Sequence, residues 1–381
     1  MKFVFVSGGV VSGLGKGIIT ASVSLLLKNQ GFKVSPVKID MYLNIDAGTL
    51  RPQEHGETFV LASGLETDQD MGNYERFLNE DLLPEDYITA GQIYQEVIKK
   101  ERAFEYEGDT VEAIPHVTNE ITRRIVEAGN KSQADIVLVE FGGTVGEYQN
   151  GIFFEAARIM ELKNPVDVVH IHVVYLPFLK NIGELKSKPA QTSVHILNSL
   201  GIQPDLIVAR SEVPVDKKRA DKIALFCNIS PENLILSPDL DSVYKVPELL
   251  AQQQIDKKIL NGLKLKPQKP NGILRDWRAM VKSMTTAKKE VTVALVTKYY
   301  KSGDFDLADS YVSVLEALKH AGIKLGLKVK IKWLNSEENL DFSGVDGVII
   351  PQGWGKRGVE GKIKAVQFAR ENKIPYLGLC Y

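Results

Sequence analysis

Apolar runs alternate with amphipathic stretches from the first residues onward. Five short runs rich in β-branched residues predict strands, because apolar runs of this kind are typical of parallel strands buried on both faces. These runs are residues 3–7, 34–39, 136–140, 166–174 and 206–209. Periodicity near 3.6 predicts helices at residues 17–29, 117–128, 153–163, 193–200 and 217–226. The alternation predicts an α/β fold around a mostly parallel sheet.

A second α/β pattern follows a break in composition. Residues 261–272 read NGLKLKPQKPNG, and a charged segment follows them. We therefore predict a first domain at residues 1–265, a linker at 266–290 and a second domain at 291–381. The predicted strands of the second domain are residues 291–297, 327–334, 347–350 and 376–379, and its helices are 308–321 and 358–372. This domain stops on its last strand, so we expect it to be incomplete.

Composition excludes several classes of protein. The 381 residues are 44% hydrophobic and 25% charged, which suits two globular domains. A net charge of −1 argues against a general nucleic-acid binder. Two cysteines predict a reducing compartment. The apolar run at the N-terminus is too short for a signal peptide, and no run approaches the ~20 residues that span a bilayer. We expect a soluble, cytoplasmic protein without membrane or nucleic-acid partners.

A phosphate-binding loop is the strongest chemical motif. Residues 7–17 read SGGVVSGLGKG between a predicted strand and a predicted helix, where backbone N–H groups and Lys16 can hold phosphates. The motif departs from the usual pattern, because Val10 replaces the first glycine and Gly17 replaces the Ser or Thr that reaches Mg²⁺. The alternative is a glycine-rich turn beside a solvent-exposed lysine. If the loop binds a nucleotide, acidic residues elsewhere must hold the metal.

Two acids and one further lysine are candidates for this site. Asp70 lies in the segment ETDQD, which we expect to be a loop, and Glu140 ends a buried strand, at the edge where α/β proteins bind ligands. Lys38 ends the second strand and should face the same edge. The alternatives are a solvated loop charge for Asp70, a helix cap or ion pair for Glu140, and a surface position for Lys38.

Basic residues before a helix indicate an anionic ligand. Lys186 and Lys188 precede the helix predicted at residues 193–200, where positive charge opposes the helix dipole. Lys222 belongs to a second basic group, on the helix predicted at residues 217–226, whose alternative is a solvated face.

The predicted second domain carries a candidate nucleophile. Cys380 follows Gly-x at the end of a strand, as in a nucleophile elbow, although a buried structural cysteine is the alternative. Upstream, the loop that contains Gly353 and Trp354 follows a strand and could offer N–H groups to an oxyanion.

These motifs, taken together and in this order, resemble the CTP synthase family. The segments that carry the resemblance include SGGVVSGLGKG, YLNIDAGT, EHGETFV, GLETDQDMGNYERF, IPHVTN, VLVEFGGTVGE, KSKPAQTSVH, DSVYKVPELL and FARENKIPYLGLC. They extend over the whole chain. The resemblance implies a P-loop synthetase domain like dethiobiotin synthetase, followed by a flavodoxin-like class I glutamine amidotransferase domain that is truncated here.

The resemblance also implies the chemistry. ATP phosphorylates O4 of UTP, and ammonia then displaces the phosphate to give CTP. The ammonia comes from glutamine hydrolysed in the second domain. Mg²⁺ as cofactor, GTP as activator, product inhibition by CTP and a homotetramer belong to the same expectation.

The family's site residues carry over by position. Lys16, Lys38 and Cys380 are the expected catalytic residues, and Asp70 and Glu140 the expected Mg²⁺ ligands. Gly353 is expected to bind glutamine at the oxyanion loop. The expected ATP-binding residues are Ser12, Gly13, Leu14, Gly15, Lys16, Gly17, Ile18 and Asp70. Those for UTP and CTP are Ser12, Glu147, Lys186, Lys188, Gln191 and Lys222.

The chain departs from the family pattern in three places. Gln149 stands where many members have an acid, and Gln352 replaces a glycine of the oxyanion loop. The sequence ends one residue after Cys380, before the family's glutaminase His and Glu, so we expect this chain not to hydrolyse glutamine and to use free ammonia if its first domain folds and forms tetramers alone. A carboligase of the dethiobiotin type, a partitioning ATPase, and an inactive subunit that assembles with complete ones remain as alternatives.

Overall fold

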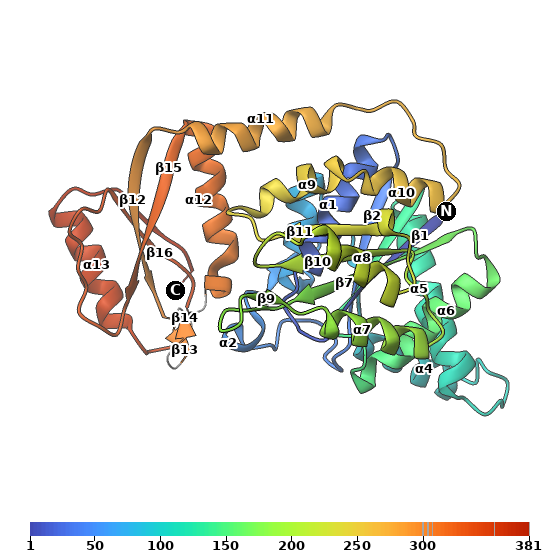
Figure 1. Cartoon of the computed structure of the whole chain (residues 1–381). Helices are drawn as coiled ribbons and strands as arrows, with labels where there is room; N and C mark the ends of the chain where they lie inside the picture. The colour runs from blue at the N-terminus through green and yellow to red at the C-terminus, as the bar shows by residue number, and fades with distance from the viewer. Residues whose placement is uncertain (299–300, 303–304, 307, 354, 381) are drawn as a thin grey trace. The chain divides into compact units, whose positions relative to one another are not determined.

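The computed structural model describes residues 1–298, 301–302, 305–306, 308–353 and 355–380 (Figure 1). Contacts divide the chain into two compact units. The first unit comprises Met1–Ala47 and Val60–Leu274, and the second comprises Gly48–Phe59 and Arg275–Tyr381. A short segment from the N-terminal part of the sequence is thus grouped with the second unit. The domain limits expected above stay a prediction.

The first unit is built on a seven-stranded sheet, in the described part of the chain, with the order β11-β10-β7-β1-β6-β2-β5. Every neighbouring pair in it is parallel, as predicted from the continuous apolar runs. The strands are β1 (Lys2–Gly8), β2 (Val34–Asp40), β5 (Tyr87–Thr89), β6 (Ile136–Phe141), β7 (Val168–Leu176), β10 (Leu206–Ser211) and β11 (Leu234–Pro238). Two small pairs accompany it, β3 (Phe59–Val60) with β4 (Glu66–Thr67) and β8 (Phe178–Leu179) with β9 (Glu184–Leu185).

Helices cover both faces of this sheet (Figure 1). Side chains alternate along a strand, so Val4 and Val6 pack with α1, α9 and α10, whereas Phe5 packs with α4, α5 and α6. The helices are α1 (Lys16–Asn29), α3 (Gln69–Leu78), α4 (Ala90–Arg102), α5 (Thr118–Lys131), α6 (Gly151–Lys163), α7 (Lys188–Ser199), α8 (Lys217–Phe226), α9 (Val246–Gln252) and α10 (Ile255–Gly262). The doubly covered parallel sheet confirms the predicted fold class.

Two predictions of local structure were wrong. Asp70, expected in a loop, lies in the first turn of α3, because Asp68 caps this helix by accepting a hydrogen bond from the Asp70 N–H. The helix expected at residues 193–200 begins at Lys188, five residues earlier, with Pro189 in its first turn, where the missing N–H costs nothing.

The second unit contains a four-stranded parallel sheet with the order β15-β12-β16-β17 in its described residues. One face packs on α12 and the other on α13. The strands are β12 (Lys289–Thr297), β15 (Leu327–Asn335), β16 (Gly347–Ile350) and β17 (Tyr376–Gly378), with a small hairpin of β13 (Lys301–Ser302) and β14 (Phe305–Asp306). The helices are α2 (Pro52–His55), α12 (Val312–Leu325) and α13 (Val359–Glu371). Much of the predicted linker is helical, as α11 (Ile273–Thr286).

The membrane prediction can be compared with these helices. Among the described residues, no helix combines the length and the apolar character needed to cross a bilayer.

Candidate functional site

The phosphate loop joins the end of β1 to the start of α1. Gly13 and Gly15 have φ of 71° and 77°, values that favour glycine, and Gly15 is the N-cap of α1. Ser12 is exposed on this loop, whereas Leu14 is buried below it. Lys16 is only 7% exposed, and its Nζ donates to the carbonyl of Gly143 at 2.7 Å. Lys16 is therefore not the solvent-exposed lysine of the alternative interpretation.

The presence of glycine at position 17 is linked to the position of Asp70. A Cβ atom at residue 17 would overlap the carboxylate of Asp70, so only glycine leaves room for this acid. The carboxylate of α3 thus lies against the first turn of α1, where the usual motif carries Ser or Thr. The same glycine therefore removes the hydroxyl of the usual motif and leaves the space that the Asp70 carboxylate occupies.

Lys38 stands at the centre of a group of carboxylates. It is 4% exposed, and its Nζ lies 2.5 Å from Asp70 Oδ2 and 3.1 Å from Glu140 Oε1. Asp68 and Asp40 follow at 3.8 and 3.9 Å. We call Lys16, Lys38, Asp70 and Glu140 the central cluster. The surface position considered for Lys38 is excluded, and Glu140 does form an ion pair.

Tyr74 and Asp68 complete this arrangement and were not among the predicted residues. The hydroxyl of Tyr74 donates to Glu140 Oε2 at 2.5 Å, so both oxygens of this fully buried carboxylate have partners. Tyr74 lies four residues after Asp70 on α3, hence on the same helix face. That spacing would have identified Tyr74 if α3 had been predicted.

Burial and charge shift the pKa values in opposite directions across the cluster. Burial lowers the pKa of Lys16, and burial raises the pKa of Glu140. Burial also opposes the charges of Lys38 and Asp70 and is the largest single effect on each, but it is outweighed by the combined effect of the four carboxylates around Lys38 and, for Asp70, of Lys38, Lys16 and Asn73. The pKa of Lys38 is therefore raised and that of Asp70 is lowered. The surrounding opposite charges and hydrogen bonds together keep this ammonium and this carboxylate charged in a buried place.

The same carboxylates can hold a divalent cation. Asp70 and Glu140 both direct an oxygen at one point, now held by Lys38 Nζ. No group of three or more His, Cys, Asp or Glu side chains suited to a metal occurs among the described residues. Two carboxylates fit Mg²⁺, which usually keeps water and substrate phosphates as its other ligands.

Glu147 lies on the loop that follows β6. Its carboxylate accepts hydrogen bonds from the N–H and Oγ1 of Thr144 at 2.7 and 2.8 Å, and from Gln149 Nε2 at 3.3 Å. The N–H of Val145 donates to the carbonyl of Gly8 at 2.8 Å. This loop and the phosphate loop are therefore joined directly.

The remaining residues predicted for the uracil nucleotide lie on α7, just before it, or on α8. Gln191 is buried on α7 and donates to Ser187 Oγ, whereas Lys188 is exposed at the start of this helix. Lys186 pairs with Glu184, and Lys222 lies on α8 over the ring of Phe226. These four residues therefore lie outside the central cluster.

In the second unit, Cys380 follows β17 and is exposed, with φ of 65°. A positive φ at a non-glycine residue suits the sharp turn of a nucleophile elbow. Gly353 follows β16, and its carbonyl accepts from Lys298 Nζ at 3.3 Å. Lys362 Nζ donates to the carbonyl of Pro351 at 3.1 Å. Sequence reasoning missed both buried lysines, and Trp354 lies outside the described residues.

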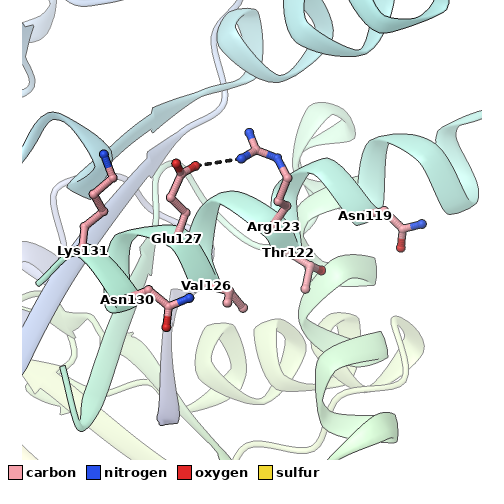
Figure 2. Close-up of a pocket in the computed structure, with 7 residues that line it drawn as sticks. All are labelled: Asn119, Thr122, Arg123, Val126, Glu127, Asn130 and Lys131. Atoms are coloured by element: carbon pink, nitrogen blue, oxygen red, sulfur yellow. Dashed lines mark hydrogen bonds and ion pairs between the residues drawn. The ribbon is translucent and has the colours of Figure 1, made fainter. Parts of the chain in front are cut away.

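A hollow of about 650 Å³ runs along the outer face of α5 (Figure 2). Its charged groups are paired: Arg123 with Glu127, and Lys131 with Glu85. None of the predicted site residues lines it. The hollow therefore does not compete with the central cluster as a catalytic site.

Comparison with known proteins gives a consistent assignment. Residues 2–265 match the family described as CTP synthase N-terminus, and residues 306–381 match glutamine amidotransferase class-I. The CTP synthase of Pyrococcus furiosus is 49% identical over 386 residues, which cover 100% of this chain and 70% of that protein. The CTP synthase of Bacillus velezensis is 46% identical over 388 residues, covering 100% and 71%.

Solved structures are more distant. The MinC:MinD cell division protein complex of Aquifex aeolicus aligns with a TM-score of 0.34 and 13% identity, over 74% of this chain and 96% of that one. The assignment does not depend on this similarity. The family matches and the full-length identities show that this chain belongs to the CTP synthase family, ligases that aminate UTP to CTP with ammonia derived from glutamine.

Proposed function

We propose that the central cluster is where this chain phosphorylates and aminates UTP. The observation that carries the proposal is the position of the Asp70 carboxylate, which lies against Gly17 and shares Lys38 with Glu140. A phosphate loop without its own metal-binding hydroxyl thereby has two acids beside it. The sequence motif alone does not show which residues would hold the metal.

The reaction has two steps. In the first step, O4 of UTP attacks the γ-phosphorus of ATP, an O–P bond forms and the bond to ADP breaks. In the second step, ammonia adds at C4 and phosphate leaves with its bonding electrons, which yields CTP after a proton is lost. Phosphorylation matters because it turns a poor leaving group into a good one.

The lysines act on the phosphates. Lys16 and Lys38 neutralise charge on the β- and γ-phosphates during transfer, which is the main catalytic contribution in phosphoryl transfer. Asp70 and Glu140 would hold Mg²⁺, which neutralises phosphate charge when it is bound. Lys38 is within reach of both acids, so metal binding requires its ammonium to move from between them toward a phosphate. Residues 12–18 contribute backbone N–H groups to ATP.

The uracil nucleotide is expected on the side of α7. Lys186, Lys188 and Lys222 offer positive charge to its triphosphate, and Gln191 offers an amide. Ser12 and Glu147 belong to loops at the same end of the sheet. CTP, which shares the triphosphate, would bind there as the feedback inhibitor.

We propose that the second unit carries the family's glutamine chemistry, in addition to the use of free ammonia expected from the sequence. Cys380 is the nucleophile that attacks glutamine, and the backbone around Gly353 stabilises the oxyanion. We further propose GTP as activator, a homotetramer and a cytoplasmic location.

The Lys16→Ala substitution tests the proposed site. We expect ammonia-dependent CTP formation from UTP and ATP, followed by absorbance, to fall to background. The matched control is Lys28→Ala on the same helix, because Lys28 pairs with Glu80 and the Leu78 carbonyl instead. Near-wild-type turnover of the Lys16 variant would refute the proposal.

A further inference from the structure

A buried histidine that the proposed reaction does not use lies between the phosphate loop and α7. His172 is on β7 and is fully buried. Its Nδ1 is 2.8 Å from Ser7 Oγ, at the end of β1, and its Nε2 is 3.1 Å from Ser193 Oγ, on α7. One imidazole ring thus links two separate elements of the first unit.

The direction of each hydrogen bond follows from the partners. Ser193 donates its hydroxyl hydrogen to the carbonyl of Ala190 at 2.9 Å, so its oxygen accepts from His172 Nε2–H. Nδ1 then carries the lone pair and accepts from Ser7 Oγ–H, whose other acceptor, the Ile171 carbonyl, is 3.5 Å away. Both ring nitrogens are therefore satisfied by a neutral ring.

The surroundings keep the ring neutral. Burial, with a smaller contribution from the charge of Lys16, lowers the pKa of His172 to about 3. A protonated ring would have two donors and would lose the bond from Ser7. The network is hence the same at any pH at which such an enzyme works.

A second contact joins α7 to the loop. A Cβ atom at Gly9 would lie 3.0 Å from Ser193 Oγ and 3.2 Å from Ser193 Cβ. The helix α7 therefore contacts the loop backbone through Ser193, the residue that is hydrogen-bonded to His172. The N–H of Gly9 donates to the carbonyl of Val173, next to His172 on β7. Strand, loop and helix therefore meet at one point.

We propose that His172 is a positioning residue that holds α7 against the phosphate loop and so sets the separation of the two bound nucleotides. This inference rests on the proposed function, because α7 carries Lys188 and Gln191 and the loop carries Lys16. In-line transfer requires the reacting atoms to be within about 3–3.5 Å, so a helix that moves by 1 Å costs rate.

The test measures nucleotide binding to the whole chain by calorimetry, with UTP and with a non-hydrolysable ATP analogue plus Mg²⁺. His172→Phe keeps the volume and removes both hydrogen bonds. We expect the His172→Phe substitution to weaken UTP binding about ten-fold. Binding of the ATP analogue should weaken less, because the loop keeps its own backbone hydrogen bonds. Ser193→Ala, a smaller change, should weaken UTP in the same direction. His172→Gln offers one donor and one acceptor and should restore most of the affinity.

The control is His170→Phe on the same strand. His170 is also buried, and its Nε2 bonds to Glu161 at 3.1 Å, but Glu161 belongs neither to the loop nor to α7. The His170→Phe substitution should lower the melting temperature and leave the affinities for UTP and for the ATP analogue unchanged. UTP affinity within two-fold of wild type in His172→Phe or in Ser193→Ala would overturn the positioning role. Wild-type chain that binds no UTP would overturn the proposed function instead, and this inference with it.

Discussion

Gly17 leaves room beside the phosphate loop for the acid that we propose as a metal ligand. In the usual motif, a hydroxyl at this position reaches Mg²⁺ from α1 itself. Here the space belongs to Asp70, which comes from α3. A single glycine therefore makes room for an acid 53 positions later in the sequence.

The Gly17→Ser substitution would restore the hydroxyl of the usual motif and should nevertheless inactivate the site. The new Cβ atom would displace the Asp70 carboxylate, and a displacement of about 1 Å can cost ~100-fold in rate. Ammonia-dependent CTP formation measures the loss. The control is Gly151→Ala in the first turn of α6, where an added Cβ meets nothing and should stabilise by about 0.5–1 kcal/mol. Equal or higher activity in Gly17→Ser would show that the Asp70 position is not needed.

At this scale the sequence indicated which residues could form a site but not how they are arranged. Lys16 and Gly17 were identifiable because the strand, loop and helix around them are contiguous, and Glu140 because it ends a buried strand. Asp70 was chosen as an acid in a loop and is a helical residue. Its closeness to Gly17 depends on how α3 packs on α1, a tertiary contact that no local pattern contains.

Among the elements, the longer buried strands were predictable, whereas the edge strands of the first sheet and marginal helices were not. The inner strands of the first sheet and the strands of the second sheet were found because their apolar runs are continuous, but β5 and β11, at the two edges of the first sheet, were missed. The helix α4 was missed, since the large apolar side chains that it buries are Ile93 and Val97, whereas Tyr94 and Ile98 are exposed. A helix of this kind is stabilised mainly by its neighbours. The partner of α4 is α5, through the carboxylate of Glu120.

Glu120 ties α4 to α5 by charge. It is almost fully buried on α5 and accepts from Lys100 Nζ of α4 at 2.7 Å, from Arg123 at 2.7 and 2.9 Å and from Arg124 at 2.9 Å. Glu120→Gln should lower the free energy of unfolding by about 2 kcal/mol at neutral pH, less than for a dry site because water reaches the partly exposed cations. The control Glu127→Gln, on the solvent side of α5, should cost no more than about 0.5 kcal/mol.

The same residue predicts a pH dependence. Burial opposes the charge of Glu120, but hydrogen bonds from Arg123, Lys100 and Arg124 outweigh it and lower its pKa to about 2, from an ordinary 4.5. The unfolded chain therefore takes up the proton first as the pH falls. The stabilisation is complete above pH 4.5 and is lost between there and about pH 2. Denaturant titrations across this window should lack that decline in Glu120→Gln, and an identical decline in both proteins would contradict the assignment.

For the whole molecule, the two compact units do not correspond to two continuous stretches of sequence. Gly48–Phe59 lies within the sequence of the first unit and yet belongs by contact to the second. Composition placed a boundary near residue 265, where Lys, Pro and Gly accumulate. Nothing comparable marks residues 48–59, because their grouping depends on individual hydrogen bonds to residues more than 250 positions away.

Glu57 makes two of these hydrogen bonds. Its Oε2 accepts from the N–H of Ser313 at 2.6 Å, in the first turn of α12, and its Oε1 accepts from Gln352 Nε2 at 2.7 Å. The N-cap residue of α12, Tyr311, makes no side-chain cap, so a carboxylate from elsewhere in the chain performs this task. Gln352, the departure from the family's glycine, adds a bond that glycine could not make.

Glu57→Ala should therefore loosen α12 and the segment 48–59 together. Losing a cap of this kind costs about 1 kcal/mol, so amide exchange at Ser313 should become about five-fold faster, as hydrogen–deuterium exchange would detect. Glu54→Ala is the matched control, because Glu54 is exposed and pairs with Arg51 of the same short segment. Gln352→Gly should accelerate exchange in 48–59 but spare Ser313, since Glu57 would still cap α12. Unchanged protection of Ser313 in Glu57→Ala would mean that α12 is held by its packing alone.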